Sequence, residues 1–450
     1  MRTLLNTLGL AGAVAVAPAQ ERQLTRAPQG HVLTNINVWS PDGRWIAYDV
    51  RAKDAVFDAT RIEHVNVETG AVLTLYEAPH GSACGVVTYS PTEPRVVFIH
   101  GPEEPTLDWN YSFTRRRGAV VNVRQPRVAR PLDAMNYAPP FAAGALRGGS
   151  HVHVFSPDGT WVSFTYEDEV LARLDAHRDA PPHEPNQRNI GVALPRGPVR
   201  VARSHPRNHD GDWFSVLVTH TVAQPKPGSD EISRAFEEGW VGRDGYMTRD
   251  GSKQKRALAF LANVSTKEGT THAEVFIADL PDDLTQAGVA PLAGTETTRP
   301  APPRGVSQRR LTFTAGRKFP GVVTAPRHWL RASPDGSQIA CLMKDEAGVV
   351  QFWTVAPADG ACRQLTHNPT DITSAFTWSP DGRWLAHTLD GSVGVTEATT
   401  GKFHRLTPQQ LGRGAPRPEA VVFSPDGKQI AFTREVTVNA TVFAQIFVVP

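Results

Sequence analysis

The residues best suited to chemistry in this sequence are histidines that stand where strand-like segments begin. Neutral imidazole binds first-row metals, and it is also the commonest general base near neutral pH. If these segments converge in the fold, the sequence predicts a metal centre or a proton-transferring site at their meeting point. The histidines at such positions are His31, His80, His151, His205, His209 and His328.

One pair of histidines has the spacing of strand residues that share a face. His151 and His153 form a His-x-His pair at the start of HVHVFSPDG, and side chains of a strand alternate between its two faces. Both rings are therefore expected on one side, where they could share a metal ion. We expect a divalent first-row metal, manganese or similar, with His209 and His328 as further ligands and His80 as an additional candidate. The alternative is that His153 packs between sheets while the others are solvated.

Aromatic residues alternate with polar ones in the segment DWNYSF, which leads into three consecutive arginines. Flat aromatic faces stack on sugar rings, and the planar guanidinium group pairs with a carboxylate through two hydrogen bonds. We therefore expect Trp109, Tyr111 and Arg115, together with Arg327, to bind an acidic sugar. The alternative is a strand with one inward aromatic face, followed by solvated arginines.

The acidic run Glu167-Asp168-Glu169 is either a cation site or a solvated loop. Motifs of other catalytic classes are missing from the sequence: G-x-S-x-G, C-x-x-C, H-E-x-x-H, the phosphate-binding G-x-x-x-x-G-K-[ST] loop and the dinucleotide-binding glycine pattern. Serine-hydrolase, zinc-protease and nucleotide chemistry are therefore disfavoured.

A repeated turn motif organises the elements that must position these residues. Proline fixes φ, aspartate bonds its own backbone and glycine adopts positive φ, so each Ser-Pro-Asp-Gly with β-rich flanks predicts a hairpin. The last three copies are spaced by 46 and 45 residues, the length of a four-stranded propeller blade. Copies begin at Ser40, Ser156, Ser333, Ser379 and Ser424, with a degenerate copy at Ser90.

The sequence predicts an all-β fold, a seven-bladed β-propeller, with six or eight blades as the alternatives. A Leu-Thr strand signature at residues 22–25 and a last unit with only three strands predict that residues 22–25 close the ring against residues 445–449. The inner strands are expected to begin near His31, Ser82, His151, Trp213, Arg327, Thr373 and Glu419.

The fourth blade is expected to carry an insertion at residues 224–249 that covers one face of the ring. Its segment 230–238 has the signals of a helix: Ser229 as the cap, acidic residues in the first turn and Gly239 at the end.

Residues 1–20 combine a single positive charge, an apolar run and small residues, as a secretory signal peptide does. The alternative is a buried first helix. We expect residues 21–450 to form one domain, a monomer in the periplasm or outside the cell, because no later run reaches the about 18 apolar residues of a membrane span. The net charge of +2, from 47 basic and 45 acidic residues, does not indicate nucleic acid as a partner. Three cysteines are too few for a disulfide framework.

Three sets of segments carry family resemblances. The Ser-Pro-Asp-Gly hairpins with their I/V-A-F runs resemble the repeat of TolB-type propellers over nearly the whole chain. The segments QLTRAPQGHVLTNINVWSPDGRWIAYDVR and PGSDEISRAFEEGWVG resemble YidR-like bacterial propellers. YSPTEPRVVFIHGPEE and HVHVFSPDG resemble blades of oligogalacturonate lyases, which implies seven blades, a divalent metal held by histidines and one glutamine, and β-elimination of uronate sugars. The glutamine is expected three residues before His151, where this chain has Gly148.

These observations support an exported propeller that binds or acts on carbohydrate, with a metal-assisted, oligogalacturonate-lyase-like reaction as the enzymatic version. In that chemistry a metal or arginine neutralises the substrate carboxylate, and a neutral histidine, His205 or His209, removes the adjacent proton. The alternatives are a TolB-like periplasmic scaffold that binds a protein, and a glycan sensor without catalysis. Three or more clustered histidines at the channel mouth would favour the enzyme.

Overall fold

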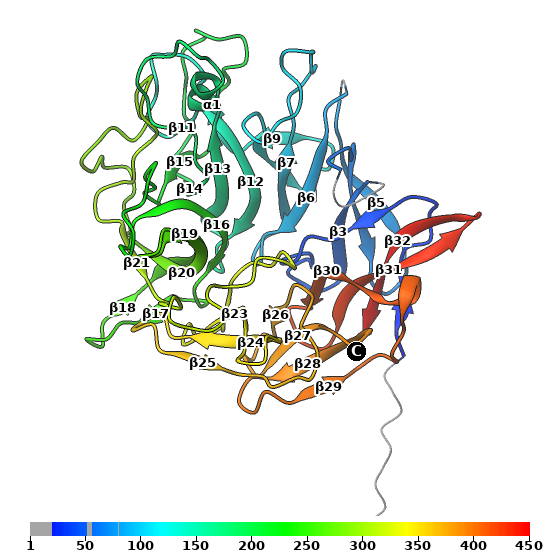
Figure 1. Cartoon of the computed structure of the whole chain (residues 1–450). Coiled ribbons are helices and arrows are strands. Elements are labelled where there is room, and N and C mark those ends of the chain that lie inside the picture. Colours follow the sequence, from blue (N-terminus) through cyan, green and yellow to red (C-terminus); the bar gives the residue numbers. More distant parts are fainter. Residues whose placement is uncertain (1–19, 52–55, 80) are drawn as a thin grey trace, which may run out of the picture.

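The structure, a computed structural model, describes residues 20–51, 56–79 and 81–450. Seven four-stranded antiparallel sheets surround a central axis as the blades of a β-propeller, as the sequence predicts (Figure 1). The signal-like residues 1–19 and His80 lie outside the described residues.

The first three blades follow the chain in order, from the innermost strand to the outermost. Blade 1 comprises β2 (His31–Val32), β3 (Trp45–Val50), β4 (Arg61–Asn66) and β5 (Val72–Glu77). Blade 2 comprises β6 (Cys84–Tyr89), β7 (Arg95–His100), β8 (Arg117–Asn122) and β9 (Ala129–Pro131). Blade 3 comprises β12 (Gly148–Phe155), β13 (Val162–Asp168), β14 (Asn189–Leu194) and β15 (Phe214–Leu217).

The remaining blades complete the ring. Blade 4 comprises β16 (Ile232–Trp240), β19 (Arg256–Ser265), β20 (Thr271–Leu280) and β21 (Ser307–Arg310). Blade 5 comprises β22 (Arg331–Ala332), β23 (Ile339–Lys344), β24 (Val350–Val355) and β25 (Cys362–Gln364). Blade 6 comprises β26 (Thr377–Trp378), β27 (Trp384–Leu389), β28 (Ser392–Glu397) and β29 (Phe403–Arg405). Blade 7 comprises β30 (Pro416–Phe423), β31 (Ile430–Val438), β32 (Thr441–Val449) and β1 (Arg22–Gln23).

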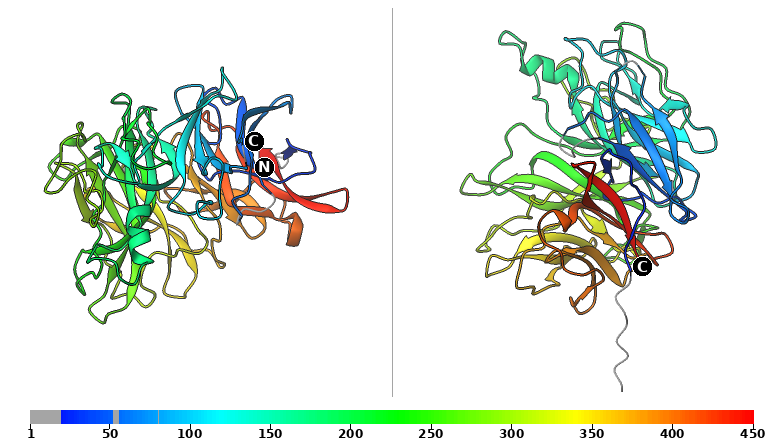
Figure 2. Two further views of the ribbon diagram at one scale, coloured as in Figure 1. Left: turned by 90° about the horizontal axis from the view of Figure 1, so that it is seen from above. Right: turned by 90° about the vertical axis from the view of Figure 1, so that its right-hand side faces the viewer.

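Blade 7 joins segments from the two ends of the described chain. β1 pairs antiparallel with β32, with Arg22 opposite Val448 and Gln23 opposite Phe447, so the blue N-terminal strand lies beside the red last strand (Figure 2). Leu24 is buried in the apolar core next to this pair. The outer edge of β32 is therefore covered rather than open to another chain.

One short helix, one 3-10 turn and two short strand pairs lie in the described connections between the blade strands. The helix α1 (Glu169–Asp175) follows β13, and a 3-10 turn spans Gly412–Gly414. Two short pairs are β10 (Ala134–Met135) with β11 (Ala145–Leu146), and β17 (Tyr246–Met247) with β18 (Lys253–Gln254). Among the described residues, no helix is both long enough and apolar enough to cross a membrane.

The Ser-Pro-Asp-Gly turns repeat one hydrogen-bond pattern. In the sixth blade the Ser379 hydroxyl donates to Asp381, and the backbone N–H groups of Arg383 and Trp384 donate to Asp381 and Ser379, respectively. Gly382 has a φ of +73°, which a side chain would strain. Ser40, Asp42, Arg44 and Trp45 bond in the same way in blade 1. These aspartates are therefore committed to the turns.

The predicted helix at residues 230–238 is wrong, because this segment is the inner strand of blade 4. β16 pairs with β19 along its length, which buries Ile232, Ala235 and Phe236 between sheets. This packing outweighs the helix propensity of the segment. The cap residue Ser229 forms a turn instead: its hydroxyl donates to the Lys226 carbonyl and accepts from the Glu231 N–H.

The start of blade 4 near Trp213 is wrong for a related reason. The run after Trp213 forms β15, which pairs with β14 as the outer strand of blade 3. Residues 224–249 are consequently not an insertion within a blade, since they contain the strand nearest the axis.

The acidic run 167–169 is neither a solvated loop nor an open cation site. Asp168 caps α1 by accepting a hydrogen bond from the Leu171 N–H, and it pairs with Arg147 at 2.8 Å. Glu169 is buried and pairs with Arg115 at 2.8 Å. The buried Arg147 and the partly buried Arg115, both absent from the local sequence pattern, explain why these carboxylates turn inward.

Candidate functional site

The two ends of the propeller are formed by different connections between strands. We call the end formed by the Ser-Pro-Asp-Gly turns the turn face. The opposite end, called the loop face, holds the connections that precede the inner strands and those that join second to third strands. Arg116, α1, Arg188 and Arg327 all lie in loop-face connections.

The inner strand of blade 3 does not present two histidines side by side. A β-bulge interrupts its register between His151 and Val154, and Val152 has a φ of +54°. The regular alternation assumed from the sequence is therefore broken. The His151 ring lies 3.3 Å from the Thr165 carbonyl, whereas the His153 ring lies 3.0 Å from the Ser150 hydroxyl.

His153 is a core residue between blades 2 and 3. It is fully buried, its Nε2 lies 3.8 Å from an Asp133 carboxylate oxygen, and a Cβ at Gly118 of blade 2 would lie 2.9 Å from the same nitrogen. The packing alternative that the sequence left open thus describes His153.

His205 and His209 lie in the connection between β14 and β15, not on the inner strands. His209 Nε2 lies 3.1 Å from a guanidinium nitrogen of Arg117, and its backbone bridges Met135. Burial, with a further contribution from Arg117, lowers the pKa of His209 to about 3, so its ring is neutral and weakly basic. His205 packs against Trp109 and Tyr137.

The four predicted metal ligands do not fit a shared metal centre. His328 is buried with its ring against Phe376 in the next blade, and its Nδ1 lies 3.1 Å from the Pro326 carbonyl. Within residues 20–51, 56–79 and 81–450, no group of three or more His, Cys, Asp or Glu side chains is placed to hold a metal. A Cβ at Gly148 would lie 2.1 Å from the Glu167 carbonyl oxygen, so the backbone leaves no space there for the expected glutamine.

Three of the four predicted sugar-binding residues have their binding surfaces occupied. Trp109 is only 8% exposed, and the guanidinium groups of Arg115 and Arg173 lie 4.7 and 4.9 Å from its ring centre. The Tyr111 ring stacks on Phe57 at 4.5 Å. The fourth residue, Arg327, has a side chain that is 52% exposed.

Arg327 belongs to a group of charged side chains that we call the arginine cluster. Arg327 pairs with Glu237 at 2.7 Å, and Arg188 pairs with Glu167 at 3.1 Å. Arg234 interacts electrostatically with both pairs. The cluster thus holds more guanidinium groups than carboxylates, and its members are Arg116, Arg188, Arg234, Arg327, Glu167 and Glu237.

The cluster contains buried donors that form no hydrogen bond among the described residues. The Nε and Nη2 atoms of Arg116 and the Nε atom of Arg188 are buried without a hydrogen bond. Arg116 reaches Glu167 only at 3.8 Å. Buried donors that stay unpaired are costly, so these atoms favour an anionic ligand.

A strained backbone and an exposed aromatic ring also mark the cluster as a candidate binding site. Glu237 has a φ of +59° in a bulge of β16, a strained conformation that is typical of functional sites. Phe113 is 61% exposed, and the Arg116 guanidinium lies 5.2 Å from its ring centre. Phe113 is the third aromatic residue of DWNYSF, and sequence reasoning missed it because only the fold shows which of the three remains open.

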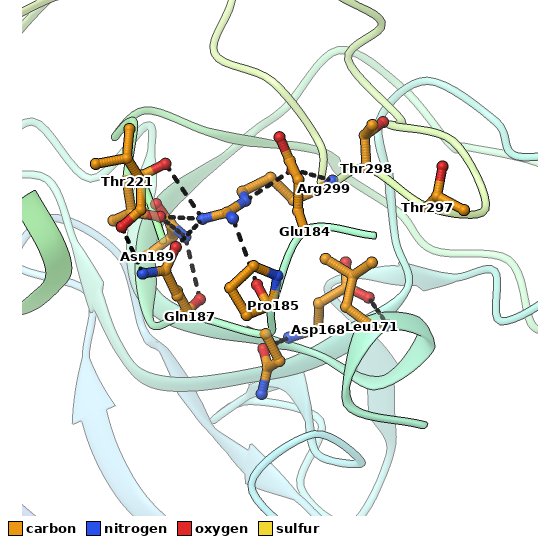
Figure 3. A network of polar contacts seen from close by, with 12 residues as sticks. Asp168, Leu171, Glu184, Pro185, Gln187, Asn189, Thr221, Thr297, Thr298 and Arg299 are labelled. Atoms are coloured by element: carbon orange, nitrogen blue, oxygen red, sulfur yellow. Dashed lines mark hydrogen bonds and ion pairs between the residues drawn. The ribbon is translucent and has the colours of Figure 1, made fainter. Parts of the chain in front are cut away.

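Arg299 holds together loops that lead into the cluster. Arg299 donates to Glu184, to the Pro185 carbonyl, to Gln187 and to Thr221 (Figure 3). These contacts tie the connection between β20 and β21 to the segment that leads into Arg188. The position of Arg188 therefore depends on a part of the chain more than a hundred residues away.

Burial and the neighbouring Arg116, Arg188 and Arg327 hold the pKa of His151 well below its usual value. Its ring is therefore neutral at the loop face. Arginines that neutralise a carboxylate would also acidify the C–H bond next to it, so the arrangement can bind an acid and polarise it.

The comparisons with known proteins agree with the fold. A family profile described as "Protein of unknown function (DUF3748)" matches residues 83–209. Oligogalacturonate lyase in complex with manganese superposes with a TM-score of 0.51 at 13% identity, over 97% of this chain and 94% of that one. The oligogalacturonate lyase of Vibrio parahaemolyticus gives 0.52 at 10% identity over the same shares. Identities this low show a shared fold.

A closer relationship exists at the level of sequence. The uncharacterized protein YidR of Escherichia coli (strain K12) is 48% identical over 426 residues, which cover 94% of this chain and 97% of that one. This seven-bladed propeller therefore belongs to the YidR family.

Proposed function

We propose that the protein binds an anionic carbohydrate, a uronate-type oligosaccharide, at the arginine cluster of the loop face. The observation that carries the proposal is the set of buried, unpaired N–H donors on Arg116 and Arg188 beside the exposed Arg327. A sugar carboxylate supplies the charge and the lone pairs that these donors lack. Phe113 offers an exposed ring for stacking on the apolar face of a sugar.

Export to the periplasm or beyond is part of the proposal. It rests on the signal-like composition of residues 1–20. The fold likeness to oligogalacturonate lyases supports the ligand class, because the names of those proteins refer to an acidic oligosaccharide, oligogalacturonate. The geometry supports binding better than metal-assisted elimination, since His151, His153, His209 and His328 make separate contacts.

Removing two arginines of the cluster is expected to weaken binding of trigalacturonate at least tenfold. A charge-assisted hydrogen bond contributes about 1.5–3 kcal/mol, and Arg188→Met with Arg327→Met removes two such donors. The measurement is isothermal titration calorimetry of trigalacturonate into both proteins at low salt. Added salt should weaken binding to the wild type, because it screens the exposed Arg327.

The matched control is Arg44→Met, which removes one exposed arginine from the turn face and should bind like the wild type. Equal affinity of the double variant and the wild type would refute the site. Ultraviolet absorbance of unsaturated products in the same mixtures separates β-elimination from binding alone.

A further inference from the structure

The turn face contains a cavity of about 420 Å³ around the propeller axis. All seven blades contribute to its walls, and in six of them the residue next to the turn is aromatic. In blade 5 the corresponding residue is Ala332, so the circle of aromatic residues around the axis is interrupted at this blade. The six aromatic residues are Trp39, Tyr89, Phe155, Trp240, Trp378 and Phe423.

The aromatic walls are held in place by hydrogen bonds between blades. The indole N–H groups of Trp39, Trp240 and Trp378 donate to backbone carbonyls of neighbouring blades at 3.0, 3.1 and 2.8 Å. The rings are thus fixed before any ligand binds, which reduces the entropy that binding would cost.

Arg331 lines the same cavity, one residue before the gap at Ala332. It is 5% exposed, its Nη2 donates to Asn35 at 2.5 Å and its Nη1 to the Leu330 carbonyl at 3.3 Å. Its Nε has no partner, and no ion pair of Arg331 forms within the described part of the chain. Burial is the main cause that lowers the pKa of Arg331 to about 9.

A buried guanidinium group without an ion pair is costly for a folded protein. Glu237 and Glu238 are close enough to act on Arg331 electrostatically, but neither forms an ion pair with it: Glu237 is paired with Arg327, and burial raises the pKa of Glu238 to about 7. A ligand anion would complete the pairing that the protein leaves open. Tyr89 and Phe155 are each only 1% exposed, so the partly exposed rings of the cavity are those of Trp240, Trp378 and Phe423. These rings favour a ligand whose remainder is flat and apolar.

We propose that the cavity binds a small carboxylic acid with a flat apolar body, its carboxylate against Arg331 and its body among the aromatic rings. The volume lies in the range of small-molecule sites. This site lies at the opposite face from the arginine cluster, and the proposal does not depend on carbohydrate binding there.

The test uses indole-3-acetate as the probe and indole-3-acetamide, which has the same shape without the charge, as its control. Calorimetric titration of the full chain should show saturable binding of the acid and at least tenfold weaker binding of the amide. Arg331→Met should bind the two compounds equally, and this apolar replacement of a buried charge is compatible with folding. Ala332→Trp, which fills the gap beside Arg331, should weaken binding of the acid.

Equal binding of acid and amide by the wild type, or binding of neither, would overturn the proposal. A peptide with a C-terminal tryptophan carboxylate offers the same groups on a longer chain. Binding of this peptide without binding of indole-3-acetate would likewise overturn the small-acid proposal and assign the cavity to peptide ends.

Discussion

Lowering the pH from 7.5 to 5.5 is expected to cost the folded protein about 6 kcal/mol of stability. Burial is the main cause that lowers the pKa of six histidines, to about 3 for His209 and to about 4 for His31, His64, His100, His328 and His387. In the unfolded chain the same groups titrate near 6.5. The unfolded state therefore binds more protons, and stability falls as the pH drops from about 6.5 toward about 4.

The magnitude follows from proton linkage. Each histidine loses about 1.4 kcal/mol over this interval, so six lose about 8 kcal/mol. Glu238 acts in the opposite direction, because burial raises its pKa to about 7, and its protonation in the folded state offsets about 2 kcal/mol. Denaturant unfolding at the two pH values measures the net loss.

A variant at one histidine provides the control for this prediction. His387 is fully buried and contacts the Thr396 hydroxyl at 2.8 Å. In His387→Gln the decrease in stability between pH 7.5 and 5.5 should be smaller by about 1.4 kcal/mol. Equal stability of the wild type at both pH values would contradict the expected neutral, buried histidines.

Replacing Arg147 by methionine is expected to lower the free energy of unfolding by about 3–5 kcal/mol, the cost of breaking a buried ion pair. The side chains of Arg147 and Asp168 are 1% and 2% exposed, and Arg147 Nε donates to Asp168 at 2.8 Å. Arg147 also donates to the carbonyls of Thr295 and Thr298. The variant would leave Asp168 buried without its cation and release the connection between β20 and β21.

The control for Arg147 is Arg130→Met, which breaks an ion pair with Asp212 at the surface. The Arg130 side chain is 71% exposed, and surface pairs contribute about 0–1 kcal/mol. Thermal and denaturant unfolding should therefore separate the two variants clearly. A similar small loss in both would show that the Arg147–Asp168 pair does not hold the loops of the site.

The sequence predicts the ring well because its turns are local signals. Ser-Pro-Asp-Gly and its degenerate copy determine six hairpins within a few residues each, so repetition accounts for six of the seven blades. Residues 230–238 show the limit of this reasoning, since Ser229, Asp230 and Glu231 are good helix-start residues that a ten-residue partner strand, β19, overrides.

The site was harder to predict because its parts come from different blades. Arg116, Arg188, Arg234 and Arg327 are far apart in sequence, and no spacing rule connects them. The His-x-His pair was misleading for a different reason: a bulge at Val152 changes the register between His151 and Val154. Only Arg327 among the predicted sugar-binding residues belongs to the cluster.

The most direct test of anionic carbohydrate binding at the loop face is whether the affinity depends on the negative charge of the ligand. Trigalacturonate and its fully methyl-esterified form have the same sugar chain, but only the acid can pair with guanidinium groups. Calorimetric titration of both into the wild-type protein at low salt should show saturable binding of the acid and at least tenfold weaker binding of the ester. Equal affinity for the two forms, or no binding of either, would contradict an arginine cluster that binds anionic carbohydrate.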